Sequence, residues 1–489
     1  MYYIGIDLGT SLIKCMLMDE AGRVCGLVSG PVTTLYPQPG WSEQEPDAWW
    51  ETTKSLLKEL ISGYPAEEIA GIGLSGQMHG LVILDEEDQV IRPAILWNDA
   101  RTGKEVTYLN EVIGRENLSH YTANIAFAGF TAPKILWLRK NEPENFRRIR
   151  KVLLPKDYLS YRLTGVYATD YSDASGTLLL DVQHRCWSPV MLQLCSLKEE
   201  QMPKLYESYA PIGTLTPEIA AELGLTTGVK VAAGASANAA AAIGTGTVGD
   251  DQCNISLGSS GTLFISSTDF MVDKFNALHS FDHADGNYHL LGCMLCAESA
   301  RTWWMEDVLQ AHGTEGEPKI TEEDLGRNQV WFVPYLMGER SPHNDPDARG
   351  TFIGMRMDSS RKDMSQAVLE GVAFAIRDSM EIARSLGFSI SHSTISGDGA
   401  RIGIWQKILA NVLNVRLEQV ANEEGACFGA AILAAVACGA YTDVESAADI
   451  LVHIENVIEP DPEIVARYEE CYFRYREIYP VLKPLYAIL

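Results

Sequence analysis

Apolar positions near the N-terminus follow two alternating patterns. Short apolar runs at 2–7, 14–18, 71–75 and 81–85 have the length of β-strands. The segment 46–61 lies between two of these runs, and its large apolar side chains recur near a period of 3.6 residues, namely Trp49, Trp50, Leu56, Leu57, Leu60 and Ile61. This stripe predicts a helix with one buried face. Strands that alternate with helices predict an α/β fold.

A strand that ends in a glycine turn occurs twice in the chain. The first copy is IGIDLGTS at residues 4–11, and the second is ISLGSSGT at residues 255–262. Because two similar segments recur far apart, we expect two related halves. Between them, residues 229–246 predict a strand, a turn of small residues and the start of an Ala-rich helix. Such a segment is a candidate for the boundary between two domains.

We place the domain boundary near Thr245, which gives domains over 1–245 and 246–489. In the second domain, the segment 389–415 predicts a strand, a glycine turn and a helix. The polar run over 312–328 predicts a surface connection.

Composition and charge narrow the class of protein. The 489 residues are 46% hydrophobic and 21% charged, which is ordinary for a globular chain and excludes a disordered polymer. At roughly 150 residues per domain, two or three domains are expected. Since 39 Lys and Arg face 65 Asp and Glu, the net charge is −26, and a nucleic acid or an anionic membrane would repel the molecule. We expect neither as a partner.

The sequence also indicates where the protein resides. Its N-terminus lacks the basic start and apolar core of a signal peptide, and the longest apolar run, residues 429–440, is too short to span a bilayer. The small residues of that run are typical of a tightly packed helix. Among ten cysteines only Cys293 and Cys296 stand at CxxC spacing, with no second pair for zinc. Reduced thiols and a cytoplasmic protein are expected.

Three glycine turns could bind phosphate. In the first, Asp7 ends an apolar strand, and the N–H groups of Gly9 and Thr10 can face an anion. A carboxylate beside phosphate needs a cation between them, so Asp7 would act through Mg²⁺. The second turn, 257–262, offers several hydroxyls, and the third, 397–401, runs into an apolar-faced helix. Each turn taken alone is equally consistent with simple packing.

A candidate substrate site lies at a strand end after residues 71–76. Residues 71–76, GIGLSG, match the dinucleotide fingerprint, but a strand-like segment follows where that fingerprint needs a helix. The next residues, Gln77, Met78 and His79, form a polar tip at a strand end, and His79 is a candidate hydrogen-bond donor to sugar hydroxyls. Trp97 lies in WNDAR, which offers further polar groups. The alternatives are a structural histidine and a local Asp–Arg ion pair in WNDAR.

Taken together, these segments resemble the FGGY family of carbohydrate kinases over almost the whole chain. The resemblance is carried by long, collinear motifs: IGIDLGTS, WSEQEPDAWW, GLSGQMHGLV, AILWNDAR, GFTAPKILW, LPKDYLSYRLTG, TDYSDASGTLLLD, ISLGSSGT, VPYLMGERSPHNDPDARGTFIG and GDGARIGIWQKILAN. Within that family, the chain is similar to the branch that acts on xylulose.

The resemblance implies two actin-like domains of the ribonuclease-H type with a catalytic cleft between them. It implies transfer of the γ-phosphoryl group of MgATP to a ketose hydroxyl, usually O5 of D-xylulose, and often a homodimer. It places Asp7 near the metal and phosphates and assigns sugar contacts to Met78 and His79, beside the candidates Gln77, Trp97 and Asn238. The phosphate turn is Ser260, Gly261 and Thr262, and the nucleotide turn is Gly397, Gly399 and Ala400.

The chain departs from the family at the catalytic base. The base is an Asp in a turn that commonly reads GGDN, whereas here the turn is Ala235, Ser236, Ala237, Asn238. Ala237 occupies the position of the base, and a methyl group cannot accept a proton. We therefore expect little or no turnover. A milder departure, Asp398 in GDGAR, affects only the details of nucleotide contact.

Two accounts of Ala237 remain open. In the first, which we favour because every other part of a working kinase is present, the base of an active kinase has been replaced to trap a substrate complex. In the second, the chain is a naturally silent relative that senses a sugar or nucleotide. A kinase for another ketose or a polyol, such as ribulose, is a further alternative.

Overall fold

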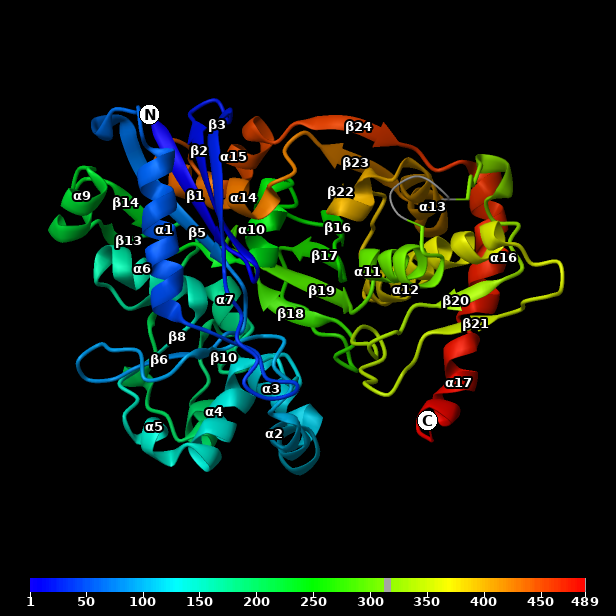
Figure 1. Cartoon of the computed structure of the whole chain (residues 1–489), viewed down its shortest axis with the longest axis horizontal. Coiled ribbons are helices and arrows are strands. Elements are labelled where there is room, and N and C mark those ends of the chain that lie inside the picture. Colours follow the sequence, from blue (N-terminus) through cyan, green and yellow to red (C-terminus); the bar gives the residue numbers. More distant parts are fainter. Residues whose placement is uncertain (312–317, 489) are drawn as a thin grey trace.

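The computed structural model describes residues 1–311 and 318–488. Two mixed β-sheets, one in each half of the chain, lie side by side with helices packed against them (Figure 1). Residues 312–317, part of the run expected as a surface connection, lie outside the described residues. Within those described ranges, no helix combines the length and apolar character needed to cross a membrane.

The first sheet contains the strands predicted by the apolar runs 2–7, 14–18 and 71–75, whereas the run 81–85 forms β6 (Val82–Leu84), which pairs with another strand outside this sheet. Its strands are β1 (Tyr2–Leu8), β2 (Leu12–Asp19), β3 (Val24–Pro31), β5 (Ile69–Gly76), β13 (Pro211–Thr214), β14 (Lys230–Ala232) and β15 (Ala235–Ser236). Their order is β13-β14-β5-β1-β2-β3, and β15 also pairs with β5. Strands β1, β2 and β3 are antiparallel neighbours, whereas β1, β14 and β15 run parallel to β5.

The second sheet repeats this plan. Its strands are β16 (Cys253–Leu257), β17 (Gly261–Ser267), β18 (His279–Asp282), β19 (Tyr288–Met294), β22 (His392–Ser396), β23 (Arg416–Val420) and β24 (Ile454–Ile458), in the order β18-β19-β17-β16-β22-β23-β24. Here too two antiparallel strands, β16 and β17, form a hairpin with a glycine turn. Strand β22 runs parallel to β16, and β23 runs parallel to β22. The expected two related halves are therefore present as two sheets of one topology.

Two helices of small residues lie between the sheets. They are α10 (Ala237–Gly244) and α14 (Gly425–Cys438), and α14 packs on β1, β5 and α10. The approach is close: a Cβ on Gly73 of β5 would lie 1.9 Å from the Ala430 carbonyl oxygen, and one on Gly429 would lie 1.9 Å from that of Ala240. The run of small residues thus forms the tightly packed helix that the sequence predicts. The predicted boundary near Thr245 falls between α10 and β16, and it stays a prediction.

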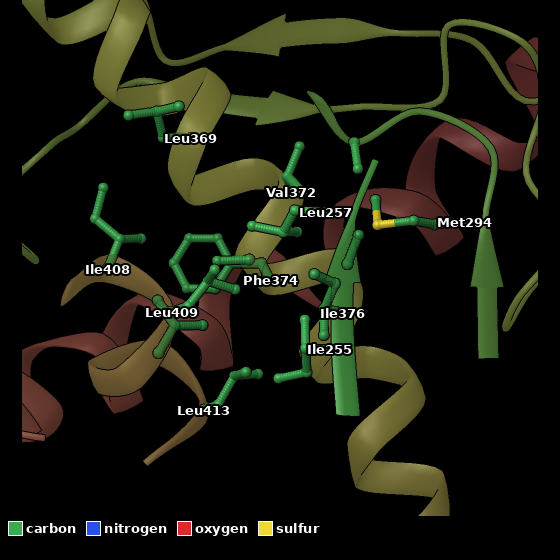
Figure 2. Packing of buried hydrophobic residues seen from close by; sticks show 14 of the residues in the cluster. Ile255, Leu257, Met294, Leu369, Val372, Phe374, Ile376, Ile408, Leu409 and Leu413 are labelled. Carbon is green, nitrogen blue, oxygen red and sulfur yellow. The ribbon is translucent and has the colours of Figure 1, made fainter. Parts of the chain in front are cut away.

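The core of the second half lies between its sheet and two helices. These are α12 (Arg361–Ser385) and α13 (Gly403–Leu413), and the apolar face predicted for α13 is buried there (Figure 2). Figure 2 shows Leu257 and Ile255 of β16 facing Phe374 of α12 and Leu409 of α13. Burying each such side chain stabilises the fold by roughly 1.5–3 kcal/mol. The end of β16 is therefore held rigidly where the second glycine turn begins.

The remaining helices cover the outer faces. In the first half they are α1 (Pro46–Leu60), α2 (Gly103–Thr107), α3 (Arg115–Thr122), α4 (Thr131–Asn141), α5 (Pro143–Arg147), α6 (Pro155–Thr164), α7 (Tyr171–Ser175), α8 (Pro189–Cys195) and α9 (Pro217–Leu223). In the second half they are α11 (Glu298–Thr302), α15 (Val444–Leu451), α16 (Pro462–Tyr475) and α17 (Ile478–Tyr486). The predicted stripe of α1, including Trp49 and Trp50, is buried.

Short strand pairs occupy the loops between these elements. They are β4 (Glu43–Gln44) with β7 (Ala94–Ile95), β6 (Val82–Leu84) with β8 (Lys151–Leu153), β9 (Ala168–Asp170) with β12 (Lys204–Tyr206), β10 (Leu180–Asp181) with β11 (Cys186–Trp187), and β20 (Trp331–Val333) with β21 (Thr351–Ile353). Because β6 follows GIGLSG where a dinucleotide fold needs a helix, that site is correctly rejected. All ten cysteines are free thiols.

Candidate active site

The turn between β1 and β2 carries the first group of predicted residues. Asp7 is the penultimate residue of β1, and Ser75 of the neighbouring strand donates a hydrogen bond to its carboxylate (3.0 Å). Burial raises the pKa of Asp7 above its ordinary value, and the Ser75 hydrogen bond opposes this rise. The turn closes when the Gly9 N–H donates to the Leu12 carbonyl (3.0 Å). A half-buried carboxylate oxygen beside a tight turn is suited to a hydrated divalent cation.

The matching turn of the second sheet joins β16 to β17. The carbonyls of Gly258 and Ser259 accept hydrogen bonds from the N–H groups of Glu298 and Ala297 (both 2.9 Å). This pairing fixes the turn against the start of α11. Gly261 and Thr262 begin β17, with Thr262 opposite Cys293 of β19. Because these hydrogen bonds engage the carbonyl groups of the turn, its N–H and hydroxyl groups can face an anion.

The predicted nucleotide turn packs directly on that hairpin. Gly397 follows β22 with φ of +88°, and a Cβ there would lie 2.6 Å from the Leu257 carbonyl oxygen. Gly399 and Ala400 are buried in the 3₁₀ helix Asp398–Arg401. The Asp398 side chain, the milder departure from the family, is 83% exposed. It therefore leaves the packing of the turn unchanged.

The two halves meet beside the nucleotide turn. A cavity of about 120 Å³ is lined by Lys14 of β2 and by residues 395–401 and 419–424 of the second half. Lys14 and Glu424 form an ion pair across it (2.5 Å). A cleft between the halves therefore opens next to the turn predicted to hold nucleotide.

A hydrogen-bond network joins the turn between β1 and β2 to the predicted sugar residues. The Thr10 hydroxyl donates to the Gln77 side-chain oxygen (3.2 Å) and accepts from the Trp97 indole N–H (2.9 Å). Gln44 completes the network, since its amide donates to the Thr10 carbonyl (2.7 Å) and accepts from Gln77 (2.9 Å). Gln44 lies in the motif WSEQEPDAWW, and no feature of that motif predicts this role. A residue that acts only through distant partners gives no local signal.

His79 is held in an unusual backbone conformation at the end of this motif. Its φ is +67°, in the left-handed region that non-glycine residues rarely adopt. Its carbonyl accepts hydrogen bonds from Lys134 (2.8 Å) and Thr131 (3.1 Å), both of which are buried. These two side chains of α4 stabilise the strained turn. They too escaped the sequence analysis.

The ring of His79 is positioned as an acceptor. Its Nδ1 lies 2.7 Å from the Gly176 carbonyl oxygen, which can only accept, so Nδ1 carries the proton. Burial lowers the pKa of His79 well below its ordinary value, and the ring is neutral. The other nitrogen, Nε2, is therefore a hydrogen-bond acceptor, whereas the sequence suggested a donor. In WNDAR, the default ion pair does form between Asp99 and Arg101 (2.7 Å).

Ala237 is the first residue of α10 and is half-buried. Its neighbour Asn238 donates to the Met78 sulfur (3.5 Å), so the turn that contains Ala237 contacts the residues predicted to bind sugar. The backbone N–H of Ser236 donates to the Ser172 hydroxyl (3.1 Å), which donates to Asp170 (2.5 Å). Strand β15 beside β5 and this hydrogen-bond chain hold the methyl group of Ala237 in place.

A wholly buried ion cluster supports that chain. The Lys156 ammonium contacts Asp157 (2.6 Å), Asp170 (2.8 Å) and Asp173 (3.7 Å). The three carboxylates raise the pKa of Lys156 against the effect of burial, so the ammonium stays charged. Both carboxylate oxygens of Asp173 lack a hydrogen-bond partner among the described residues, and burial raises the pKa of Asp173 well above its ordinary value. This cluster is structural support beneath the site.

Comparison with known proteins places these features in a family. The N-terminal domain model of the FGGY family of carbohydrate kinases matches residues 2–244, and the C-terminal domain model of the same family matches residues 253–438.

Individual relatives are similar over nearly their full length. The xylulose kinase of Escherichia coli K12 is 41% identical over 99% of this chain and 100% of its own. A crystal structure of a "xyloylose kinase" from Brucella ovis superimposes with a TM-score of 0.92 at 42% identity, covering 99% of this chain and 100% of that one. The gluconate kinase of Lactobacillus acidophilus also reaches 0.92, at 25% identity and 99% coverage of both chains.

Proposed function

Because this chain belongs to the FGGY family of carbohydrate kinases, we propose that it binds MgATP and a ketopentose and transfers the γ-phosphoryl group to the sugar, converting D-xylulose to D-xylulose 5-phosphate. The observation that carries this proposal is the network through Thr10, since one hydroxyl links the turn between β1 and β2 to both Gln77 and Trp97. Full-length relatives named xylulose kinases support the choice of sugar.

The residues divide into two groups across the cleft. Asp7, Gly9 and Thr10 face the phosphates from the first sheet. Ser260, Gly261, Thr262, Gly397, Gly399 and Ala400 surround the nucleotide from the second sheet. Phosphoryl transfer depends mainly on in-line positioning and charge neutralisation. Rigid turns on opposite sheets supply the positioning.

The donor set around Asp7 fits Mg²⁺. The described residues contain no group of three or more His, Cys, Asp or Glu that could hold a metal by themselves. Mg²⁺ needs no such cage, since it keeps several waters and takes one or two carboxylates together with substrate phosphates. Asp7 would hold it, and the ion would neutralise developing negative charge on the phosphoryl oxygens.

We further propose that turnover is slow because Ala237 replaces the base. A positioned base contributes about 10²- to 10⁴-fold to such a reaction. Sugar binding does not need it, because Gln77, Met78, His79, Trp97 and Asn238 remain in place. The same residue favours a second candidate function, a sensor that binds ketose or nucleotide without turning it over. Ribulose, gluconate and polyols are alternative substrates of the same site.

The test measures ATP consumption with D-xylulose for this chain and for Ala237→Asp. Sugar binding is first confirmed for both by calorimetry, and Ala237→Asn is the matched control, since it adds similar bulk without a base. We expect Ala237→Asp to raise kcat by about 10²-fold or more and Ala237→Asn to leave it unchanged.

Each other outcome is decisive. Ordinary turnover by the unaltered chain would show that the base is not at position 237. Sugar binding with no turnover in either form would favour the sensor, and failure of both to bind D-xylulose would overturn the choice of substrate.

A further inference from the structure

An arginine of the second half reaches into the sugar side of the site. The Arg340 guanidinium lies 5.1 Å from the ring centroid of Phe127, which belongs to the loop before α4 in the first half. Phe127 in turn lies 5.0 Å from the His279 ring. Burial is the main cause that lowers the pKa of both His79 and His279, and the positive charge of Arg340 lowers both further. Arg340 therefore spans the gap between the two halves.

The backbone around Arg340 is anchored firmly to the second sheet. The buried Glu339 carboxylate accepts hydrogen bonds from the N–H groups of Leu295 (3.0 Å) and Arg340 (2.8 Å). The N–H of Ser341 donates to the Cys293 carbonyl (2.9 Å). These contacts fix the backbone position from which the Arg340 side chain extends toward Phe127.

The Arg340 guanidinium has no direct ion pair. Over the ranges that the structure describes, it forms no ion pair with a carboxylate, and its aromatic contact with Phe127 is weak. The charge of Arg340 acts on the buried Glu339 carboxylate, whose pKa is raised by burial and lowered in part by Arg340. Guanidinium groups near an interface usually pair with carboxylate or phosphate, and they donate up to five hydrogen bonds. Donors of Arg340 are thus available for an oxygen-rich ligand in the cleft.

The surroundings complement a neutral sugar. His79 Nε2 can accept a hydrogen bond from a hydroxyl, while Arg340 can only donate hydrogen bonds. Three rings pack between them: Phe130 lies 4.6 Å from His79, Phe127 lies 5.4 Å from Phe130, and Phe127 lies 5.0 Å from His279. An acceptor, a donor and an apolar wall match the hydroxyls, carbonyl oxygen and C–H groups of an open-chain ketose.

We propose that Arg340 is a sugar-binding residue, contributed by the second half, that donates hydrogen bonds to the carbonyl end of the ketose opposite His79. This inference rests on the proposed function, since it names a contact in the same site. Because Arg340 bridges to Phe127, the sugar it binds is held by both halves at once.

Calorimetry of D-xylulose binding tests the proposal with the unaltered chain, Arg340→Gln, Arg340→Lys and the control Arg356→Gln. Arg356 is an exposed arginine of the same half, in the loop between β21 and α12. Loss of hydrogen bonds from a charged group predicts that Arg340→Gln weakens D-xylulose binding by about 10- to 100-fold. Arg340→Lys should recover part of the affinity because it keeps one charged donor, and Arg356→Gln should bind as the unaltered chain does.

Two further measurements separate binding from folding and from charge. The melting temperature and the affinity for a non-hydrolysable ATP analogue should be unchanged in Arg340→Gln, since neither depends on the sugar contact. D-gluconate is the second probe, and tighter binding of D-gluconate than of D-xylulose would overturn the assignment to a neutral ketose.

The failures of the two proposals differ. If the unaltered chain binds D-xylulose and Arg340→Gln binds it equally well, only the role of Arg340 is overturned. If the unaltered chain binds no D-xylulose, the proposed substrate is wrong, and the proposed contact of Arg340 with that substrate is wrong too.

Discussion

Single residues set the chemistry of the sugar site, and His79 shows how. A hydrogen bond to the Gly176 carbonyl fixes its tautomer, and Lys134 and Thr131 hold its strained backbone. The sequence identifies His79 as polar and placed at a strand end. It cannot identify the tautomer, because that depends on a carbonyl 97 residues away.

We predict that D-xylulose binding is insensitive to pH between 8 and 5.5. Burial lowers the pKa of His79 well below its ordinary value, so the acceptor nitrogen stays unprotonated across this range. Calorimetric dissociation constants at several pH values, with the ATP analogue as the control ligand, provide the check. Sugar affinity that falls steeply through pH 6.5 while nucleotide affinity stays level would show that His79 titrates as an ordinary histidine.

At the scale of elements, the sequence predicts most of what carries the site. The strands β1 and β16, the helix α13 and the tight helix α14 are encoded by local patterns: apolar runs, a glycine at a turn, and a repeat of small residues. Local patterns do not predict the roles of Gln44, Thr131, Lys134 and Arg340. These roles arise only when segments distant in sequence are brought together. The proposal that Ala237 occupies the base position rests on the family pattern and on no local feature of the sequence.

The packing of α16 on α12 leads to a stability prediction. Glu370 of α12 is buried and accepts hydrogen bonds from Gln366 (2.8 Å) and Tyr468 of α16 (2.8 Å). Burial raises the pKa of Glu370 to about 7. A carboxyl whose pKa is raised on folding stabilises the fold fully below its unfolded pKa, and this contribution is lost as pH rises through about 7.

The melting temperature should therefore decline as the pH rises from about 4.5 to about 7, and it should level off above pH 7, where Glu370 is ionised in both the folded and the unfolded chain. Glu370→Gln, which keeps the shape and one acceptor but does not ionise, should decline less and melt a few degrees higher than the unaltered chain at pH 8. Thermal unfolding at pH 5, 6, 7 and 8 measures both. Parallel curves for the two proteins would mean that Glu370 is not the titrating group.

At the scale of the whole molecule, the two halves are joined at several points. Lys14 pairs with Glu424, and Asn124 exchanges hydrogen bonds with the backbone of Ser280 (2.8 and 3.2 Å). Arg185 of the first half pairs with the buried Asp282 of β18 (2.8 Å). The ligands proposed for the cleft would add contacts to both halves.

We predict that D-xylulose together with a non-hydrolysable ATP analogue closes the molecule. Small-angle scattering should show a smaller radius of gyration with both ligands than without, because each ligand contacts both halves. Ala237→Asp should compact to the same extent, since closure depends on binding contacts and not on the base. An unchanged radius in a protein shown to bind both ligands would contradict this.

The course of α14 has a consequence for dividing the chain. This helix belongs to the second half in sequence, yet it packs on β1 and β5, where Gly5 and Gly73 leave room for its backbone. A fragment ending near Thr245 would leave those strands uncovered, and the complementary fragment would expose an Ala- and Gly-rich helix to water. The two fragments should aggregate when each is produced alone and should recover their structure when they are produced together. The molecule is therefore suited to fragment complementation, in which the extent of fragment assembly measures ligand binding.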